Sequence, residues 1–443
     1  MNKSYRTVWN EALGAWVAAS EITKARGKRS RSGTVVAAAA MVLVLGGAGN
    51  AIAQTTRNVD GGIASGASMA ISPMATGGDC FGLGVATTGS ALGLAIGCAA
   101  NTTTGSTNIA IGTAAHAGTS DGSGNGDQTA IGYGAQATGV DSLALGAQVQ
   151  ALSSNSLAIG NSGDGVDNNS SGAISIGNGG NVTNSAQATL LGRSANITNS
   201  VNGVAVGAGA RVTSSGTAIA IGAGAVVIGA ANSVALGSSA NVQSVDVNVQ
   251  IANGTAVGAG AKVTGDSGTA VGRLALASGA GAIAIGGNSV AALATKASGL
   301  NAIAMGNGAK ATGESSISIG TGNDVSGSRS GAIGDPTFIT GDDSYAIGNN
   351  NTIAAGKAFV LGNNVTVAAG LDGAVVLGND STVAAATATP TGVINGNTYT
   401  YAGGAPEAGD VVSVGSDTAP RQIQNVAAGR VTAASTDGRQ LQR

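Results

Sequence analysis

Short apolar segments that end in glycine recur along most of the chain. Nineteen of them lie between Leu94 and Gly378, and most alternate small with branched apolar residues before the glycine. The step from one glycine to the next is fourteen or fifteen residues in most cases, and the longer steps contain loop insertions such as 121–128 and 245–250. Because self-similarity at a short fixed period is typical of stacked repeats, the pattern predicts a solenoid.

One unit, residues 207–222, shows how the period is filled. Ile219 and Ile221 alternate with two alanines, which is the period-2 pattern of a strand, and Gly222 ends the strand where a positive φ is easiest. A weaker alternation over residues 208–212 predicts a return strand. Two strands of about five residues and two turns account for the observed period.

A single coil of this kind buries only a couple of Ile, Val or Leu residues, too few for stability. Stacking the coils about 4.8 Å apart pairs every strand with the next and forms a continuous apolar column. Alanine and glycine let the two walls approach closely. The sequence therefore predicts an all-β protein, a parallel β-roll or solenoid of about 14–15-residue coils.

Composition agrees with such a structure and argues against an ordinary enzyme. The 443 residues include 76 glycines, whereas only 9% are charged and 2% aromatic. A typical globular domain is about 25% charged and about 7% Gly. One histidine and two cysteines leave little material for catalysis, so no cofactor or metal site is expected.

The first 53 residues are predicted to direct export. An apolar run at 34–48 follows a basic segment, is too short for a membrane span, and precedes small residues that place cleavage after Ala53. An uncleaved N-terminal anchor is the alternative. Residues 1–33 hold seven of the twenty basic side chains, so the remainder is acidic overall and nucleic acid is not an expected partner.

The segment ahead of the apolar run resembles the extended signal-peptide region of large Gram-negative autotransporters. The resemblance rests on Met1-Asn2-Lys3, Tyr5-Arg6, Val8-Trp9-Asn10, Gly14, Trp16-Val17, Ser20-Glu21, Lys24 and Gly27-Lys28. In that family the extension is thought to slow inner-membrane translocation and is lost with the signal peptide.

The repeats resemble the heads of trimeric autotransporter adhesins, the YadA-like family. Asn155–Gly160 and Asn232–Gly237 match its repeat closely, and the resemblance covers residues 91–385, after a lead-in at 54–90. It implies a left-handed β-roll, three chains side by side in a homotrimer, and a place on the cell surface or outer membrane.

Beyond residue 385 the period fails. Residues 386–410 read as an insert, and 411–443 resemble the family's neck through Val414-Gly415, Arg421-Gln422-Ile423 and Asn425–Gly429. Family members continue into a stalk and an outer-membrane anchor, and neither pattern is recognisable here. We expect either a truncated passenger, which we favour, or a head that works without its own anchor, in which case it is extracellular or periplasmic.

Few residues suggest chemistry. Gly265–Gly268 spells a serine-protease motif, but His116 is the only histidine and the motif falls at a predicted turn. Asp121–Gly126 copies the start of a calcium loop, but position twelve is Gly132 rather than Glu, so a surface loop is favoured over a calcium site. Cys80 and Cys98 are about one coil apart, so they are either a disulfide that staples the first coil or two buried thiols.

The leading functional hypothesis is a surface adhesin head that attaches the cell to host matrix, host cells or sister cells, with virulence as the expected context. A structural spacer without a ligand is the alternative. A polysaccharide-cleaving β-helix is disfavoured because it needs carboxylate clusters and aromatic platforms, and an ice-binding ladder because threonines lie mostly beside turns. The sequence names no individual ligand-binding residue.

Overall fold

The structure is a computed structural model. It describes residues 5–10, 15–20, 57–59, 68–71, 87–90, 92–103, 107–119, 126–161, 163–246, 249–401 and 403–427. The chain divides into two units, Met1–Ile52 and Ala53–Arg443. In the first unit, β1 (Tyr5–Asn10) and β2 (Ala15–Ser20) form an antiparallel hairpin.

The second unit is built on two long parallel sheets. The first, which we call the repeat sheet, contains the glycine-terminated repeats. Its strands are β3 (Arg57–Val59), β4 (Met69–Ile71), β6 (Leu94–Ile96), β8 (Ile109–Ile111), β10 (Thr129–Ile131), β12 (Leu143–Leu145), β14 (Leu157–Ile159), β16 (Ile174–Ile176), β18 (Thr189–Leu191), β20 (Val204–Val206), β22 (Ile219–Ile221), β25 (Val234–Leu236), β28 (Thr255–Val257), β30 (Thr269–Val271), β32 (Ile283–Ile285), β34 (Ile303–Met305), β36 (Ile317–Ile319), β38 (Gly331–Ile333), β40 (Tyr345–Ile347), β42 (Phe359–Leu361), β44 (Val375–Leu377) and β47 (Val412–Ser413).

We call the second sheet the return sheet, and its strands alternate along the chain with those of the repeat sheet. Its strands are β5 (Thr87–Thr88), β7 (Asn101–Thr102), β9 (His116–Ala117), β11 (Gln136–Ala137), β13 (Gln150–Ala151), β15 (Gly165–Val166), β17 (Asn181–Thr183), β19 (Asn196–Thr198), β21 (Arg211–Thr213), β23 (Val226–Ile228), β26 (Asn241–Gln243), β29 (Lys262–Val263), β31 (Leu276–Ala277), β33 (Lys296–Ala297), β35 (Lys310–Ala311), β37 (Asp324–Val325), β39 (Thr337–Ile339), β41 (Asn351–Ile353) and β43 (Thr366–Val367).

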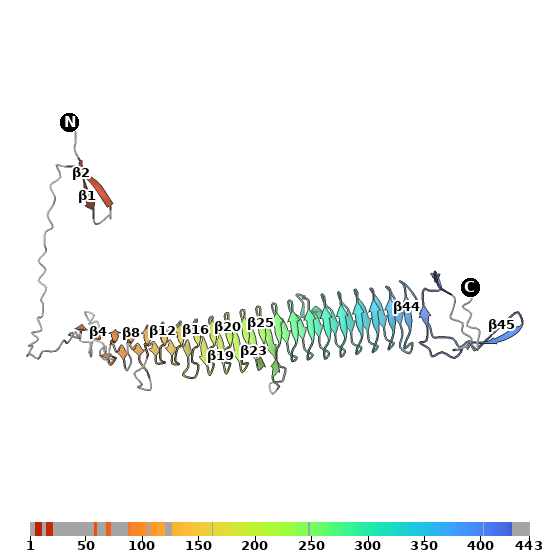
Figure 1. Ribbon diagram of the computed structural model, residues 1–443, viewed down its shortest axis with the longest axis horizontal. Helices are drawn as coiled ribbons and strands as arrows, with labels where there is room; N and C mark the ends of the chain where they lie inside the picture. Colours follow the sequence, from red (N-terminus) through yellow and green to blue (C-terminus); the bar gives the residue numbers. More distant parts are fainter. Residues whose placement is uncertain are drawn as a thin grey trace, which may run out of the picture. The chain divides into compact units, whose positions relative to one another are not determined.

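Each strand pairs in parallel with the equivalent strand of the next coil. In β22, for example, Ile219, Ala220 and Ile221 face Val234, Ala235 and Leu236 of β25. The two sheets appear in Figure 1 as two rows of arrows, stacked in chain order from β4 to β44. Within the described residues the return sheet has 19 strands, one per coil. The predicted parallel β-solenoid is confirmed, while its left-handedness stays an implication of the family resemblance.

The interior of the roll is lined mainly by small side chains. Every central alanine of the repeat sheet, such as Ala220, is fully buried, and the return sheet contributes buried Ala, Val or Ile, such as Val212. The residues that flank the alanine point outward: Ile219 is half-buried and Ile221 is exposed. The expectation that Ile and Leu of the repeat fill the core is therefore wrong for most coils, because the alternation places the central, usually small, residue inside and both flanking residues outside. A few strands bury a larger central residue, such as Leu190 of β18.

The strands are also shorter than expected. Those of β4 to β44 in the repeat sheet have three residues, and those of the return sheet have two or three, rather than about five. Positive φ angles end them early. Gly222 has φ of 135° directly after β22, and residues such as Ser214, with φ of 50°, turn the chain after return-sheet strands. Because such angles break the extended backbone, turns take a larger share of each coil.

Buried serines connect successive coils at the turn that follows the return sheet. The backbone N–H of Ser200 donates to Ser185 Oγ at 2.9 Å, and that of Ser215 donates to Ser200 Oγ at 3.1 Å. Ser200 Oγ in turn donates to the carbonyl oxygen of Thr198 at 2.8 Å. All three serines are fully buried. The ladder therefore satisfies turn N–H groups that the sheets leave without a partner.

Among the described residues, three segments depart from the regular coil. Around the insertion after β26, β24 (Ala230–Ala231) and β27 (Ile251–Ala252) form an extra two-stranded parallel sheet. The insertion before β33 contains a 3₁₀ turn, η1 (Ala291–Leu293). In the segment 386–410, β45 (Thr391–Ile394) and β46 (Asn397–Thr400) form an antiparallel hairpin.

The chain then returns to the end of the roll. β47 extends the repeat sheet beyond β44. Arg421 closes the last coil, because its guanidinium donates to Ser381 Oγ at 2.8 Å and to the carbonyl oxygens of Val414 and Asn379 at 3.1 and 2.6 Å.

Candidate functional site

The outer face of the repeat sheet is apolar over its whole length. From β4 to β44 the outward positions carry aliphatic or aromatic side chains, four threonines and one glycine, and no charged or amide side chain. Exposed members of this face are Leu145, Leu191, Ile221, Leu236, Met305, Ile333, Tyr345, Ile347, Phe359 and Leu361. Twenty strands at about 4.8 Å extend for roughly 90 Å. A continuous apolar surface of that length is typical of an interaction site.

The outer face of the return sheet is mainly polar, with Val226, Ile228, Leu276 and Phe338 as its apolar members. Asn101, His116, Gln136 and Gln150 occupy consecutive rungs of its outward column. Gln150 Nε2 donates to Gln136 Oε1 at 3.4 Å, and Thr87 Oγ1 donates to Asn101 Oδ1 at 2.8 Å. The roll thus has one apolar and one mainly polar face. Sequence reasoning missed this difference because it assigned the large residues of the repeat to the interior.

Two edges of turns connect the sheets, and we name them by their place in the coil. The glycine edge follows each repeat-sheet strand, and the opposite edge follows each return-sheet strand. The opposite edge carries most of the acidic side chains of the described roll: Asp127, Asp141, Asp167, Asp246, Asp266, Glu314, Asp342, Asp343 and Asp372. Several of these carboxylates accept a backbone N–H of the preceding coil: Asp141 from Asp127 at 3.0 Å, Asp266 from Ala252 at 2.7 Å, and Asp372 from Gly356 at 2.9 Å.

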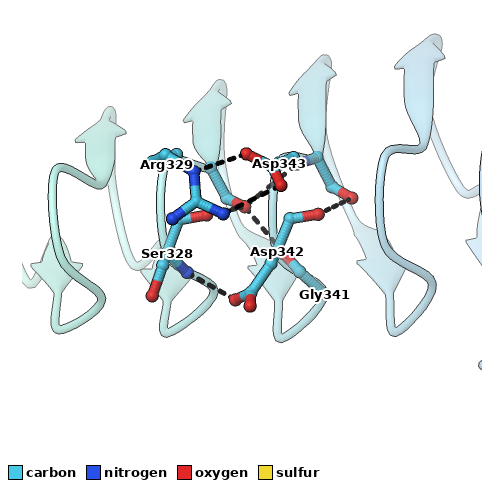
Figure 2. A network of polar contacts seen from close by, with 7 residues as sticks. Ser328, Arg329, Gly341, Asp342 and Asp343 are labelled. Atoms are coloured by element: carbon cyan, nitrogen blue, oxygen red, sulfur yellow. Dashed lines mark hydrogen bonds and ion pairs between the residues drawn. The ribbon is translucent and has the colours of Figure 1, made fainter.

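Figure 2 shows such a contact on the opposite edge, where Ser328 N–H donates to Asp342 Oδ1 at 2.7 Å. Beside it, Arg329 forms a two-point ion pair with Asp343, with N···O distances of 2.7 and 2.9 Å. The hydrogen bond from Arg329 lowers the pKa of Asp343, and the same bond raises the pKa of Arg329. Both groups are solvated, so the pair adds little to stability.

An open depression of about 550 Å³ lies next to this pair and is lined by Asp342, Asp343, Lys357 and Asp372 among others. A second, of about 390 Å³, lies between the end of the roll and the Arg421 segment. In the parts of the chain that the structure describes, no group of three or more His, Cys, Asp or Glu side chains is arranged to hold a metal ion.

His116 projects from the polar face between Asn101 and Gln136. It is half-buried rather than fully solvated, and this desolvation lowers the pKa of its imidazole below the ordinary value of 6.5. The folded state therefore favours the neutral ring.

This shift predicts a pH-dependent stability of the N-terminal coils. At pH above 6.5 the ring is neutral in both states, whereas below 6.5 the unfolded chain binds a proton more readily, so stability decreases as the pH falls through 6.5. His116→Gln should abolish this decrease while retaining the side-chain type of Gln136, the next rung. Hydrogen-exchange protection of coils 109–137 at pH 7.5 and 5.0, corrected for intrinsic exchange, measures the difference. An unchanged pH dependence in the variant would rule out His116 as its source.

The structure separates the residues of the protease-like motif from the only histidine. Gly265–Gly268 forms the turn after β29, where Ser267 Oγ donates to Asp266 Oδ2 at 3.1 Å. His116 lies nine coils earlier in the return sheet, about 40 Å away at the usual strand spacing. These residues therefore do not form a catalytic triad.

Two other segments singled out in the sequence fall largely outside the described residues. Asp121–Asn125 of the calcium-like loop is not described, whereas Gly132 directly follows β10 within the repeat, so the surface loop favoured for this segment stays a prediction. Cys98 follows β6 and takes part in a disulfide. Its expected partner Cys80 lies outside the described residues, so the pairing of the two also stays a prediction.

Comparison with known families finds matches to the N-terminal segment and to several coils of the roll. Residues 1–49 match the extended signal peptide of the type V secretion system. Residues 129–148, 252–275, 277–292 and 297–323 match the YadA head domain repeat, and these segments coincide with coils of the roll. No curated protein matches the chain at a significant level.

The two matches agree with the resemblance seen in the sequence. The chain combines a type V secretion signal with a YadA-like head, as the trimeric autotransporter adhesins do. The extended signal peptide indicates export, and the matched families are those of surface-displayed adhesins rather than enzymes. Among the helices of the described residues, none is long and apolar enough to span a membrane.

Proposed function

We propose that the roll is the head of a surface adhesin that attaches the cell to host matrix, host cells or neighbouring cells. The observation that carries this proposal is the combination of a type V export signal with YadA-like coils in one chain. The depressions of the described roll are open and partly polar, which suits extended contacts with large partners better than enclosure of a small molecule.

The head functions as a homotrimer in this proposal, with the outer faces of three repeat sheets packed around a common axis. A lone chain exposes a row of Ile, Leu, Tyr and Phe side chains roughly 90 Å long, and burial of this row favours association. Two further copies of the same chain suit this surface, because three identical rolls place equivalent apolar strands at the same level along the common axis. The polar return sheets then face outward.

Adhesion by such a head is multivalent. Each trimer carries three copies of every outward patch, so the second and third contacts are intramolecular once the first has formed. Weak individual contacts therefore suffice.

The test is attachment by the full chain, exported from a Gram-negative host, purified and coupled to beads. We expect the beads to bind at least one of collagen, fibronectin, laminin or epithelial cells, or to clump with one another. Beads coated with heat-unfolded protein are the control. Trimeric, folded protein that neither binds any of these surfaces nor clumps would contradict the proposal and favour the spacer.

A further inference from the structure

Most cations and most acids of the described roll lie on different sides. Six of the eight basic side chains described between residues 68 and 382 are on the return sheet or the glycine edge: Arg193, Arg211, Lys262, Arg273, Lys296 and Lys310. Between residues 193 and 310 the chain has two acids, Asp246 and Asp266, and both lie on the opposite edge. The stretch therefore carries one positively charged side, which we call the basic stripe.

The register of the return sheet aligns these cations. Arg211, Lys262 and Lys296 each begin a strand and are exposed. The beginning of a return-sheet strand is the end nearest the glycine edge, where the exposed Arg193 and Arg273 directly follow repeat glycines. The stripe runs over eight rungs, from β19 to β35, or roughly 34 Å.

Most of the stripe is not neutralised by the protein. Lys310 pairs with Asp324 at 3.5 Å, whereas none of the other five cations forms an ion pair with a described residue. Lys296 and Lys310 are register partners, and like charges opposite each other disfavour strand pairing. An external polyanion that spans several strands reduces this repulsion, and binding of such a polymer to the stripe is therefore electrostatically favourable.

The surroundings of the stripe indicate which kind of polyanion fits. Asn196, Thr198, Thr213 and Asn241 lie among the cations, so amides and hydroxyls are available to hydrogen-bond sugar hydroxyls and sulfates. The chain has no aromatic residue between Tyr133 and Phe338, and hence none on which nucleic-acid bases could stack. The apolar residues that face outward among these cations, Val226, Ile228 and Leu276, are each half-buried, which is unfavourable for insertion into a lipid surface.

We propose that the basic stripe is a docking surface for a linear sulfated polysaccharide, lying along the roll axis. This inference deepens the proposed adhesin function and rests on it, because only a surface-exposed head meets such a polymer. In the trimer described above, the stripe faces outward in three copies. The acidic opposite edge repels the same polymer and so restricts it to the stripe.

The first measurement is binding of the purified, full-length exported protein to immobilised heparin. Vesicles containing phosphatidylserine, oligo(dT) and the unsulfated polysaccharide hyaluronan serve as competing probes. We expect heparin to bind most tightly, with an affinity that decreases steeply with salt. Stronger binding to the vesicles or to oligo(dT), or no binding to heparin at low salt, would overturn the proposal.

A matched pair of double variants tests whether heparin binds at the basic stripe. Arg273→Gln with Lys296→Gln removes two charges from the stripe, whereas Arg329→Gln with Lys357→Gln removes the same two residue types from the opposite edge. The first variant should bind heparin roughly thirtyfold more weakly, and the second within about twofold of the parent. Equal losses in both variants would show a response to net charge alone and contradict a defined stripe.

The bead assay separates failure of this inference from failure of the adhesin function. If the beads bind matrix proteins or cells but the protein does not bind heparin, the proposed polysaccharide site is wrong and the adhesin function stands. If the folded trimer binds neither heparin nor any other surface and does not clump, both the polysaccharide site and the adhesin function are contradicted. Because the four substituted side chains are exposed, we expect all variants to fold, which circular dichroism checks.

Discussion

Replacing Gly222 with alanine should lower the local free energy of unfolding by roughly 4 kcal/mol, since a φ unsuited to L-residues and a backbone overlap each cost about 1–3 kcal/mol. Gly222 has φ of 135°. A Cβ there would meet the carbonyl group of Gly237 in the next coil, with the carbonyl carbon at 2.5 Å. That neighbour is backbone, so it has no rotamer through which to move away.

Gly209→Ala is the matched control. Gly209 also has a positive φ, of 66°, but nothing lies within 4 Å of the position its Cβ would take. Alanine already occupies the equivalent turn position in two other coils, as Ala99 and Ala114, with φ of 55° and 57°. We therefore expect a cost of only about 1 kcal/mol at this site.

Hydrogen exchange measured peptide by peptide is the suitable readout, because a stacked repeat opens locally and a single melting temperature does not describe it. Gly222→Ala should lose protection in the coils on both sides of residue 222, and Gly209→Ala should lose little. Similar protection in the two variants would mean that close approach of successive coils does not set the glycine requirement.

The coil itself was predictable because its determinants are local. The recurring glycine fixes where each repeat strand ends, and the spacing of glycines gives the length of one coil. A chain with one short period and alternating apolar residues has few ways to satisfy its backbone hydrogen bonds other than stacking. For this reason the sequence located nineteen repeats and the existence of a return strand, although that strand is Arg211–Thr213 rather than the predicted 208–212.

Which side of the strand faces inward was not predictable. Alternation of Ala218, Ile219, Ala220 and Ile221 is satisfied equally well with alanine inside or isoleucine inside, because a period of two defines two faces without ranking them. In the structure the central residue, such as Ala220, lies inside with Val212 of the return sheet, whereas Ile219 and Ile221 lie on the outer face.

The basic stripe escaped detection for a related reason. Lys262 and Lys296 are 34 positions apart in the sequence and look unrelated, since neither begins an obvious cluster. Insertions lengthen two of the coils between Arg211 and Lys296, so simple counting by fifteen loses the register. Only the strand pairing shows that Lys262 and Lys296 are separated by a single rung, that of Leu276.

Aspartate at Ile219 and Ile221 together should convert the trimer into monomers. Both side chains flank Ala220 on the outer face of the repeat sheet, where the proposed assembly packs three chains together. The double substitution places six carboxylates near the trimer axis, and burying an unpaired charge costs several kcal/mol per ion. In the isolated roll the same positions are half-buried or exposed, so the coil itself tolerates the change.

The same coil offers a control on its other sheet. Val226 and Ile228 flank the buried Val227 of β23 as Ile219 and Ile221 flank Ala220, and both face outward from the return sheet. Val226→Asp with Ile228→Asp therefore imposes the same charge and the same loss of strand propensity on a face that stays solvated. Light scattering should find monomers for the first variant and trimers for the second. The reverse outcome would place the return sheet at the axis, hide the basic stripe inside the assembly, and so contradict both the proposed trimer and the polysaccharide site.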